Sequence, residues 1–277
     1  MSYRTQSLIK SNIELPSIEK KLSICLKSNG FSFSVISTQD ILLAIGDVEH
    51  ISDEPYNIVS SANEVRSYFT AQNIPFTGYS QVKLIVPSVY GVWVPDELYD
   101  ESKQRQYLNI VGYKNTDLGI TAVHNSTIMS QMVFSYNINT VAPYKVAFPG
   151  LIITNQHDAL VNDYVRRWAS DCPMILLNLR DNYMDIVVFV QSKLQLSTTY
   201  EVSSVKDVVM RTIDVMKRLN IEQPNTQLQL CGDVSRDIYA VFRDYFPIVR
   251  LYTGRPLRFG AQEMQQVHSY KYPFILS

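Results

Sequence analysis

A hairpin near the amino terminus decides the fold that we expect for this chain. Residues 22–36 read LSICLKSNGFSFSVI: an apolar run, a turn at Ser28-Asn29-Gly30, and a second run rich in apolar residues. Asn-Gly is a strong signal for a tight hairpin turn, because both turn residues must take positive φ. The stretch therefore predicts two antiparallel strands. In the second strand Phe31, Phe33 and Val35 alternate with serines, which predicts one apolar and one polar face.

The same pattern recurs at residues 175–189, which read ILLNLRDNYMDIVVF around a turn at Asp181-Asn182-Tyr183. Aligning Leu26 with Leu179 gives an offset of 153 residues, and this offset also pairs Asn29 with Asn182. Residues 186–190 in the second strand of this copy are continuously apolar, so we expect this strand to be covered on both faces. The constant offset indicates an internal duplication.

Similar elements follow each hairpin. A third strand is expected at 40–45 in the first copy and at 193–200 in the second. A helix comes next in each copy, because Ser61 and Glu64 form a capping box and Ser204 with Asp207 offers a shorter version of that cap. In the second copy a strand, a helix and a strand complete a β-β-β-α-β-α-β unit, at 227–230, 235–246 and 248–251.

The first copy carries an additional stretch, which we place at about residues 77–128 as an insertion. The strand pattern resumes at 129–136, and a helix at 157–170 leads into the second copy. We therefore expect an α/β protein with mixed sheets, in which residues 1–170 form one lobe and residues 171–277 form a similar lobe across a central cleft.

Composition excludes several classes of partner. The 277 residues include 18% charged residues and carry a formal net charge of −1, so the basic excess typical of nucleic-acid binding is missing. No stretch approaches the roughly 20 apolar residues that a membrane helix needs, and the amino terminus lacks the apolar core of a signal peptide. We expect a cytoplasmic protein. Three cysteines without a CxxC pair indicate neither a disulfide frame nor a metal site.

The order of the elements and their duplication are similar to the actin-like ATPase superfamily, which includes actin, Hsp70 and the sugar kinases. More narrowly, three runs resemble an uncharacterised family that is known mainly from Bacteroidetes and has been assigned an actin-like fold. These runs are NGFSFSV at 29–35, WVPDELYD at 93–100 and QYLNIV at 106–111. The resemblance covers about residues 22–252 and implies a duplicated actin-like, ribonuclease-H-like fold without an assigned function.

The resemblance also implies where a nucleotide site would lie. In active members of the superfamily the first hairpin of each lobe carries a carboxylate and a glycine, which organise Mg²⁺ and let the backbone approach phosphate. Here Ser28 stands in place of the first carboxylate, and Tyr183 in place of the second glycine. Each phosphate motif is thus half present, so hydrolysis by the family mechanism is not expected. The candidate residues of a vestigial nucleotide cleft are Ser28, Asn29, Gly30, Asp181, Asn182, Gly232 and Asp233.

Other chemistry has less support. The histidines are widely spaced, and none pairs with another at i+3 or i+4, so we expect them in loops or at helix starts rather than as ligands. Asp181 and Asp233 both follow strand ends, which leaves open a two-carboxylate metal site of the nuclease type. Aspartate is equally a favoured turn residue, and that second interpretation stays open as well.

The insertion is rich in aromatic residues, which suits either a partner surface or a small local core. The aromatic residues in question are Tyr90, Trp93, Tyr99, Tyr107 and Tyr113. The preferred hypothesis from the sequence is a non-catalytic scaffold that binds another protein or itself, without nucleic acid, membrane or an obligatory cofactor. The alternatives are an ATPase or kinase-like enzyme that binds a nucleotide with Mg²⁺ in the cleft, and a metal-dependent nuclease.

Overall fold

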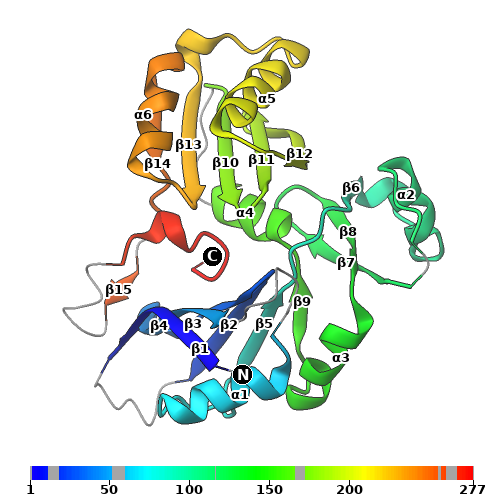
Figure 1. The fold of residues 1–277 in the computed structure, drawn as a ribbon. Coiled ribbons are helices and arrows are strands. Elements are labelled where there is room, and N and C mark those ends of the chain that lie inside the picture. The colour runs from blue at the N-terminus through cyan, green and yellow to red at the C-terminus, as the bar shows by residue number, and fades with distance from the viewer. Residues whose placement is uncertain are drawn as a thin grey trace.

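A computed structural model describes residues 2–11, 19–51, 60–115, 117–165, 172–254, 257–259 and 267–276. The first lobe is built on a seven-stranded sheet with the order β1-β4-β3-β2-β5-β9, in which β15 also pairs with β4 (Figure 1). Its strands are β1 (Ser2–Lys10), β2 (Lys20–Lys27), β3 (Gly30–Ser37), β4 (Ile41–Ile51), β5 (Gln81–Ile85), β9 (Ile152–Thr154) and β15 (Arg258–Phe259).

The second lobe repeats the core of the first. Its five-stranded sheet has the order β12-β11-β10-β13-β14, which matches β4-β3-β2-β5-β9 strand for strand. In both sheets the first three strands are antiparallel and the last two are added in parallel. The predicted duplication and the α/β class are therefore confirmed. The strands are β10 (Met174–Arg180), β11 (Tyr183–Val190), β12 (Lys193–Glu201), β13 (Gln227–Gly232) and β14 (Val249–Leu251).

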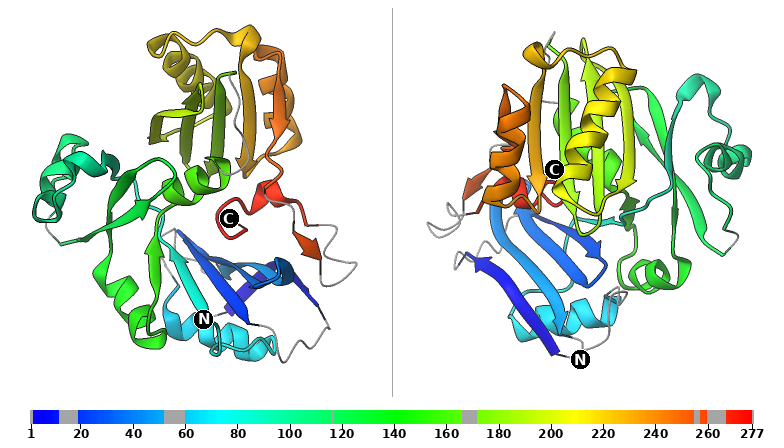
Figure 2. Two further views of the ribbon diagram at one scale, coloured as in Figure 1. Left: turned by 180° about the vertical axis from the view of Figure 1, so that it is seen from behind. Right: turned by 45° about the horizontal axis from the view of Figure 1, so that its top comes forward.

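Helices cover the outer faces of the two sheets (Figures 1 and 2). The predicted capping box of α1 (Ala62–Ala71) is present, because the side chains of Ser61 and Glu64 each accept a hydrogen bond from the other residue's backbone N–H. The Ser204 side chain likewise caps α5 at the N–H of Asp207. Helix α5 spans Val205–Arg218, and α3 (Ile138–Ala147) and α6 (Arg236–Tyr245) are further helices of the two lobes. Helix α4 (Gln156–Val165) instead packs in the apolar cluster shared by both sheets. No helix in the described ranges is both long and apolar enough to span a bilayer.

A third, small sheet projects from the first lobe. It consists of β6 (Gly91–Pro95), β8 (Ser130–Tyr136) and β7 (Gly119–Asn125), and α2 (Gln104–Ile110) accompanies it. The expected insertion at 77–128 does not coincide with this unit, since β5 pairs in parallel with β2 in the large sheet while β8 lies beyond residue 128. We propose residues 91–136 as the added part. The end of the expected helix at 166–170, and with it the boundary between lobes, falls outside the described residues.

The core between the lobes has a component from the far end of the chain. The C-terminal segment, which we define as residues 267–276, lies between the two sheets (Figures 1 and 2). It places Phe274, Ile275 and Leu276 in the same apolar cluster as residues of β2, β4, β10 and α4. Every residue of β3 is buried, and the segment contacts the polar face of this strand where the Ser34 hydroxyl donates a hydrogen bond to the backbone oxygen of Ile275. Part of the expected second lobe thus packs against the first sheet.

Candidate functional site

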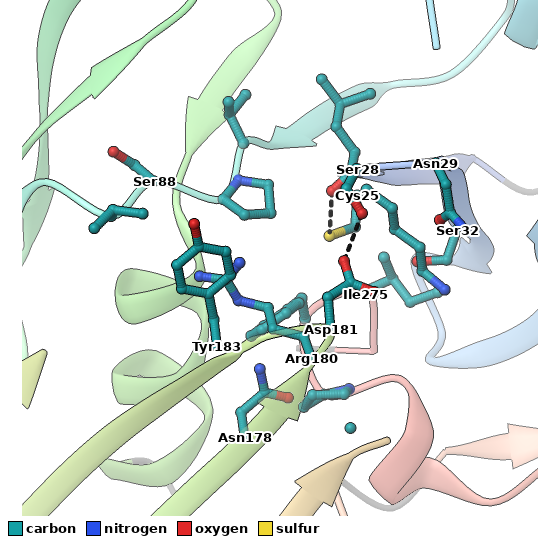
Figure 3. A pocket seen from close by; sticks show the side chains of 18 of the residues that line it. Cys25, Ser28, Asn29, Ser32, Ser88, Asn178, Arg180, Asp181, Tyr183 and Ile275 are labelled. Atoms are coloured by element: carbon teal, nitrogen blue, oxygen red, sulfur yellow. Dashed lines mark hydrogen bonds between the residues drawn. The ribbon is translucent and has the colours of Figure 1, made fainter. Parts of the chain in front are cut away.

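A cavity of about 480 Å³ lies between the lobes, where the β2–β3 turn and the β10–β11 turn approach each other. Figure 3 shows side chains from both turns directed into it. Five of the seven candidate residues of the nucleotide cleft line this cavity, and Gly30 and Asn182 are not among its lining residues. The five are Ser28, Asn29, Asp181, Gly232 and Asp233. The fold therefore brings together turns that are far apart in the sequence.

The two turns are joined directly across the cavity. The Ser28 hydroxyl donates a hydrogen bond of 2.5 Å to Oδ2 of Asp181. These two residues occupy equivalent positions in the duplicated hairpins, 153 residues apart. The serine that replaces the expected carboxylate thus binds the carboxylate that the other hairpin retains. The Ser28 hydroxyl and the Asp181 carboxylate thus bind each other, whereas in an active site groups of this kind would bind a ligand.

Two of the glycines have a structural reason to be present. A Cβ atom on Gly30 would lie 2.0 Å from the backbone oxygen of Val48, where β3 pairs with β4. A Cβ atom on Gly232 would lie 2.1 Å from the backbone oxygen of Leu179, where β13 pairs with β10. Gly232 also has a φ of +79°, which favours glycine. Strand packing therefore accounts for both glycines without a phosphate group.

Charge in the cavity is largely compensated within the protein. Lys27 forms an ion pair of 2.5 Å with Asp47, and although burial lowers the pKa of Lys27, the charge of Asp47 raises it above its ordinary value overall. The guanidinium of Arg180 holds Asp185 with two hydrogen bonds, of 2.8 and 3.0 Å. Burial, together with the charges of Asp181 and Asp47, raises the pKa of Asp233. Of the three cations that line the cavity, Lys27 and Arg180 are thus each paired with a carboxylate, and Lys271 is the third.

A buried polar network behind the cavity was not foreseen from the sequence. Asp185 is completely buried, and it accepts hydrogen bonds from Asn178, Arg180 and Thr199. The Gln156 amide lies 3.3 Å from Asp185 and also donates to the backbone oxygen of Ser88, which connects α4 with both lobes. The charge of Arg180 and these hydrogen bonds outweigh the effect of burial and lower the pKa of Asp185 to about 2. An aspartate inside the apolar run 184–190 was the available sequence signal.

His157 belongs to the same network. It lies at the start of α4, as expected, but its ring is buried and its two nitrogens lie 2.8 Å from the Ser197 hydroxyl and 3.0 Å from the Thr199 hydroxyl. Burial lowers the pKa of His157 to about 4. The imidazole is therefore neutral near pH 7 and acts as a hydrogen-bonding strut between α4 and β12.

Tyr183, which stands in place of the second glycine, lines the cavity, and the Arg180 guanidinium lies 5.2 Å from the centre of its ring. The described residues contain no group of three or more His, Cys, Asp or Glu side chains placed to hold a metal ion. Asp181 and Asp233 lie close enough to interact, since the charge of Asp181 is one of the causes that raise the pKa of Asp233, after burial. This proximity fits the interpretation of both aspartates as turn residues.

The aromatic residues of the small sheet are partly buried in its core. Tyr90, Tyr99 and Tyr107 pack against a cluster formed by Val94, Leu108, Tyr113 and Val133, whereas Trp93 packs against the core between the lobes. The Tyr107 hydroxyl donates to the backbone oxygen of Leu98 at 2.7 Å. The exposed apolar side chains of this unit lie beside them and include Leu98, at 69% exposed, and Ile110, at 80%. That the aromatic residues of the small sheet bind a partner stays a prediction.

Comparison with known proteins supports the fold. A Bacteroides thetaiotaomicron protein with an actin-like ATPase fold and unknown function is 18% identical to this chain and superposes with a TM-score of 0.73. The match covers 90% of this chain and 95% of the Bacteroides chain. The PilM-PilN type IV pilus biogenesis complex gives 11% identity, 94% and 97% coverage, and a TM-score of 0.58. The protein EutJ from Carboxydothermus hydrogenoformans gives 10% identity, 97% and 90% coverage, and 0.51.

A search of curated proteins finds no match. The model of a family described as a protein of unknown function, DUF3822, matches residues 11–249. The match covers most of the chain, and the similar Bacteroides protein agrees with the expected family and fold. The chain therefore belongs to the DUF3822 family and has the actin-like ATPase fold.

Proposed function

We propose that this protein is a non-catalytic scaffold or protein-interaction protein that retains the actin-like fold and has lost ATP hydrolysis. The observation that carries the proposal is the hydrogen bond between Ser28 and Asp181. It joins the two turns that would have to hold the phosphates and Mg²⁺, and it engages the Ser28 hydroxyl and one carboxylate oxygen of Asp181 with each other.

The charge of the site supports the same proposal. The cavity is lined by three cationic residues and four acidic ones, and Lys27 and Arg180 are each paired with a carboxylate. A triphosphate placed here would meet the carboxylates of Asp181 and Asp233, while both cations of the hairpins already have carboxylate partners. Mg²⁺ would offset only part of this repulsion.

Calorimetric titration with Mg·ATP tests the proposal directly. We expect no binding in the micromolar range and no release of inorganic phosphate during long incubation. The Ser28→Ala variant is an informative companion, because it frees Asp181 from its partner without adding charge. Micromolar affinity together with turnover in the unaltered protein would show that the scaffold proposal is wrong.

The second candidate is an ATPase or kinase-like enzyme with displaced residues, and the cavity volume favours it. A volume of about 480 Å³ lies in the usual range for small-molecule sites. In such an enzyme Asp181 would hold the metal, so Asp181→Asn should abolish any turnover. Activity that survives this substitution excludes that mechanism.

A scaffold also requires a partner, and the exposed apolar side chains of the small sheet are our proposed contact. The PilM-PilN complex shows that a protein of this fold can be solved together with another protein. A pull-down that recovers one partner should lose it when Leu98 and Ile110 become serine. The matched control is Val146→Ser, since Val146 is 85% exposed on α3, away from this surface. Equal recovery with all variants would exclude the proposed surface.

A further inference from the structure

The C-terminal segment contributes side chains to a core that belongs to both lobes. Phe274, Ile275 and Leu276 are buried, with 8%, 1% and 4% of each residue exposed. They share one apolar cluster with Leu42 on β4 of the first sheet and with Leu176 on β10 of the second. Separation of the lobes would therefore expose apolar surface on the segment and on both sheets.

Polar contacts fix the segment to the first lobe. The hydroxyl of Ser34, which is fully buried on β3, donates a hydrogen bond of 2.5 Å to the backbone oxygen of Ile275. The hydroxyls of Ser7 on β1 and Tyr272 lie 2.6 Å apart. Earlier in the chain, β15 pairs in parallel with β4. A serine of the predicted polar face of β3 thus binds the C-terminal segment.

The segment also forms part of the cavity wall. Together with the two hairpin turns, the segment lines the cavity through residues 271–275. Figure 3 shows Ile275 beside the side chains of the turns. The C-terminal segment, which packs against both lobes, therefore also limits the cavity between them.

We propose that the C-terminal segment is an intramolecular ligand of the interlobe cleft, which holds the two lobes in one arrangement and closes one side of the cavity. Hydrogen bonds attach it to the first lobe, and apolar contacts attach it to the second. The cleft then opens only when the segment leaves its place. This inference concerns lobe motion and does not depend on the proposed function.

The distance between spin labels on the two lobes tests the proposal. Val146→Cys on α3 and Met210→Cys on α5 place labels at exposed positions, and Cys172→Ser removes the exposed native cysteine. With an intact segment we expect one narrow distance distribution. Replacement of residues 274–276 by alanine should add a broader population at longer distances.

A matched control separates loss of the segment from loss of core volume in general. Leu108→Ala removes a fully buried side chain from the small-sheet core and should leave the distance distribution unchanged. The segment does not hold the lobes in one arrangement if the folded triple variant keeps the narrow distance distribution. The same conclusion follows if the unaltered protein already shows a broad distribution.

A milder variant covers the case in which the triple variant does not fold. Ser34→Ala removes only the donor to Ile275 and leaves a buried carbonyl without its partner. We expect amide hydrogen exchange in residues 272–276 and in β10 to accelerate by about tenfold or more, while α1 is unaffected. Uniform acceleration, or none, contradicts the proposal.

Discussion

Acidification should destabilise this protein through His157. The ordinary histidine pKa is 6.5, and burial lowers the pKa of His157 to about 4 in the folded state. Because the unfolded chain takes up the proton first, the stabilisation is complete above pH 6.5 and is lost as the pH falls toward 4. The difference between the two pKa values corresponds to about 3 kcal/mol in the free energy of unfolding. The pKa of Asp185 is about 2, so its carboxylate stays ionised throughout this window.

Urea denaturation at a series of pH values between 7 and 4 measures this effect. The unaltered protein should lose most of the 3 kcal/mol over that range, whereas His157→Gln should remove this part of the pH dependence. His124→Gln is the control, because His124 is half-exposed beside Asp96 in the small sheet and should leave the dependence in place. If His157→Gln shows the same pH dependence as the unaltered protein, the buried neutral imidazole is not the cause.

Two further predictions concern stability and use the same assay. Gly30→Ala should lower the free energy of unfolding by at least about 2 kcal/mol, because the added Cβ meets the Val48 oxygen. Gly78→Ala should lower it by about 1 kcal/mol, since Gly78 also has a positive φ but no atom lies within 4 Å of the added Cβ. Equal losses would contradict the packing argument. Asp185→Asn should cost about 3–5 kcal/mol, because it leaves the largely buried Arg180 without its counter-charge, and a loss below about 1 kcal/mol would show that water reaches the pair.

Local patterns made much of the fold predictable. The turn at Ser28-Asn29-Gly30 and the constant offset to Asp181 identified both hairpins, and the cap at Ser61 marked the first helix, because turns and caps depend on residues next to each other in the chain. The element order β-β-β-α-β-α-β of the second lobe was also predicted from the pattern along the chain. The edges of the added sheet were harder to place, because β5 and β6 are both short strands and only pairing distinguishes them.

The sequence alone determined the duplicated unit, since it depends on hydrophobic periodicity and turn chemistry, and the resemblance to the actin-like superfamily indicated which turns face the cleft. The tertiary structure alone decided how the cleft is filled. The bond from Ser28 to Asp181, the network around Asp185 and the seat of the C-terminal segment on Ser34 each join residues from different strands or lobes. Contacts of this kind depend on how two sheets are placed against each other, and no pattern along a single strand carries that information.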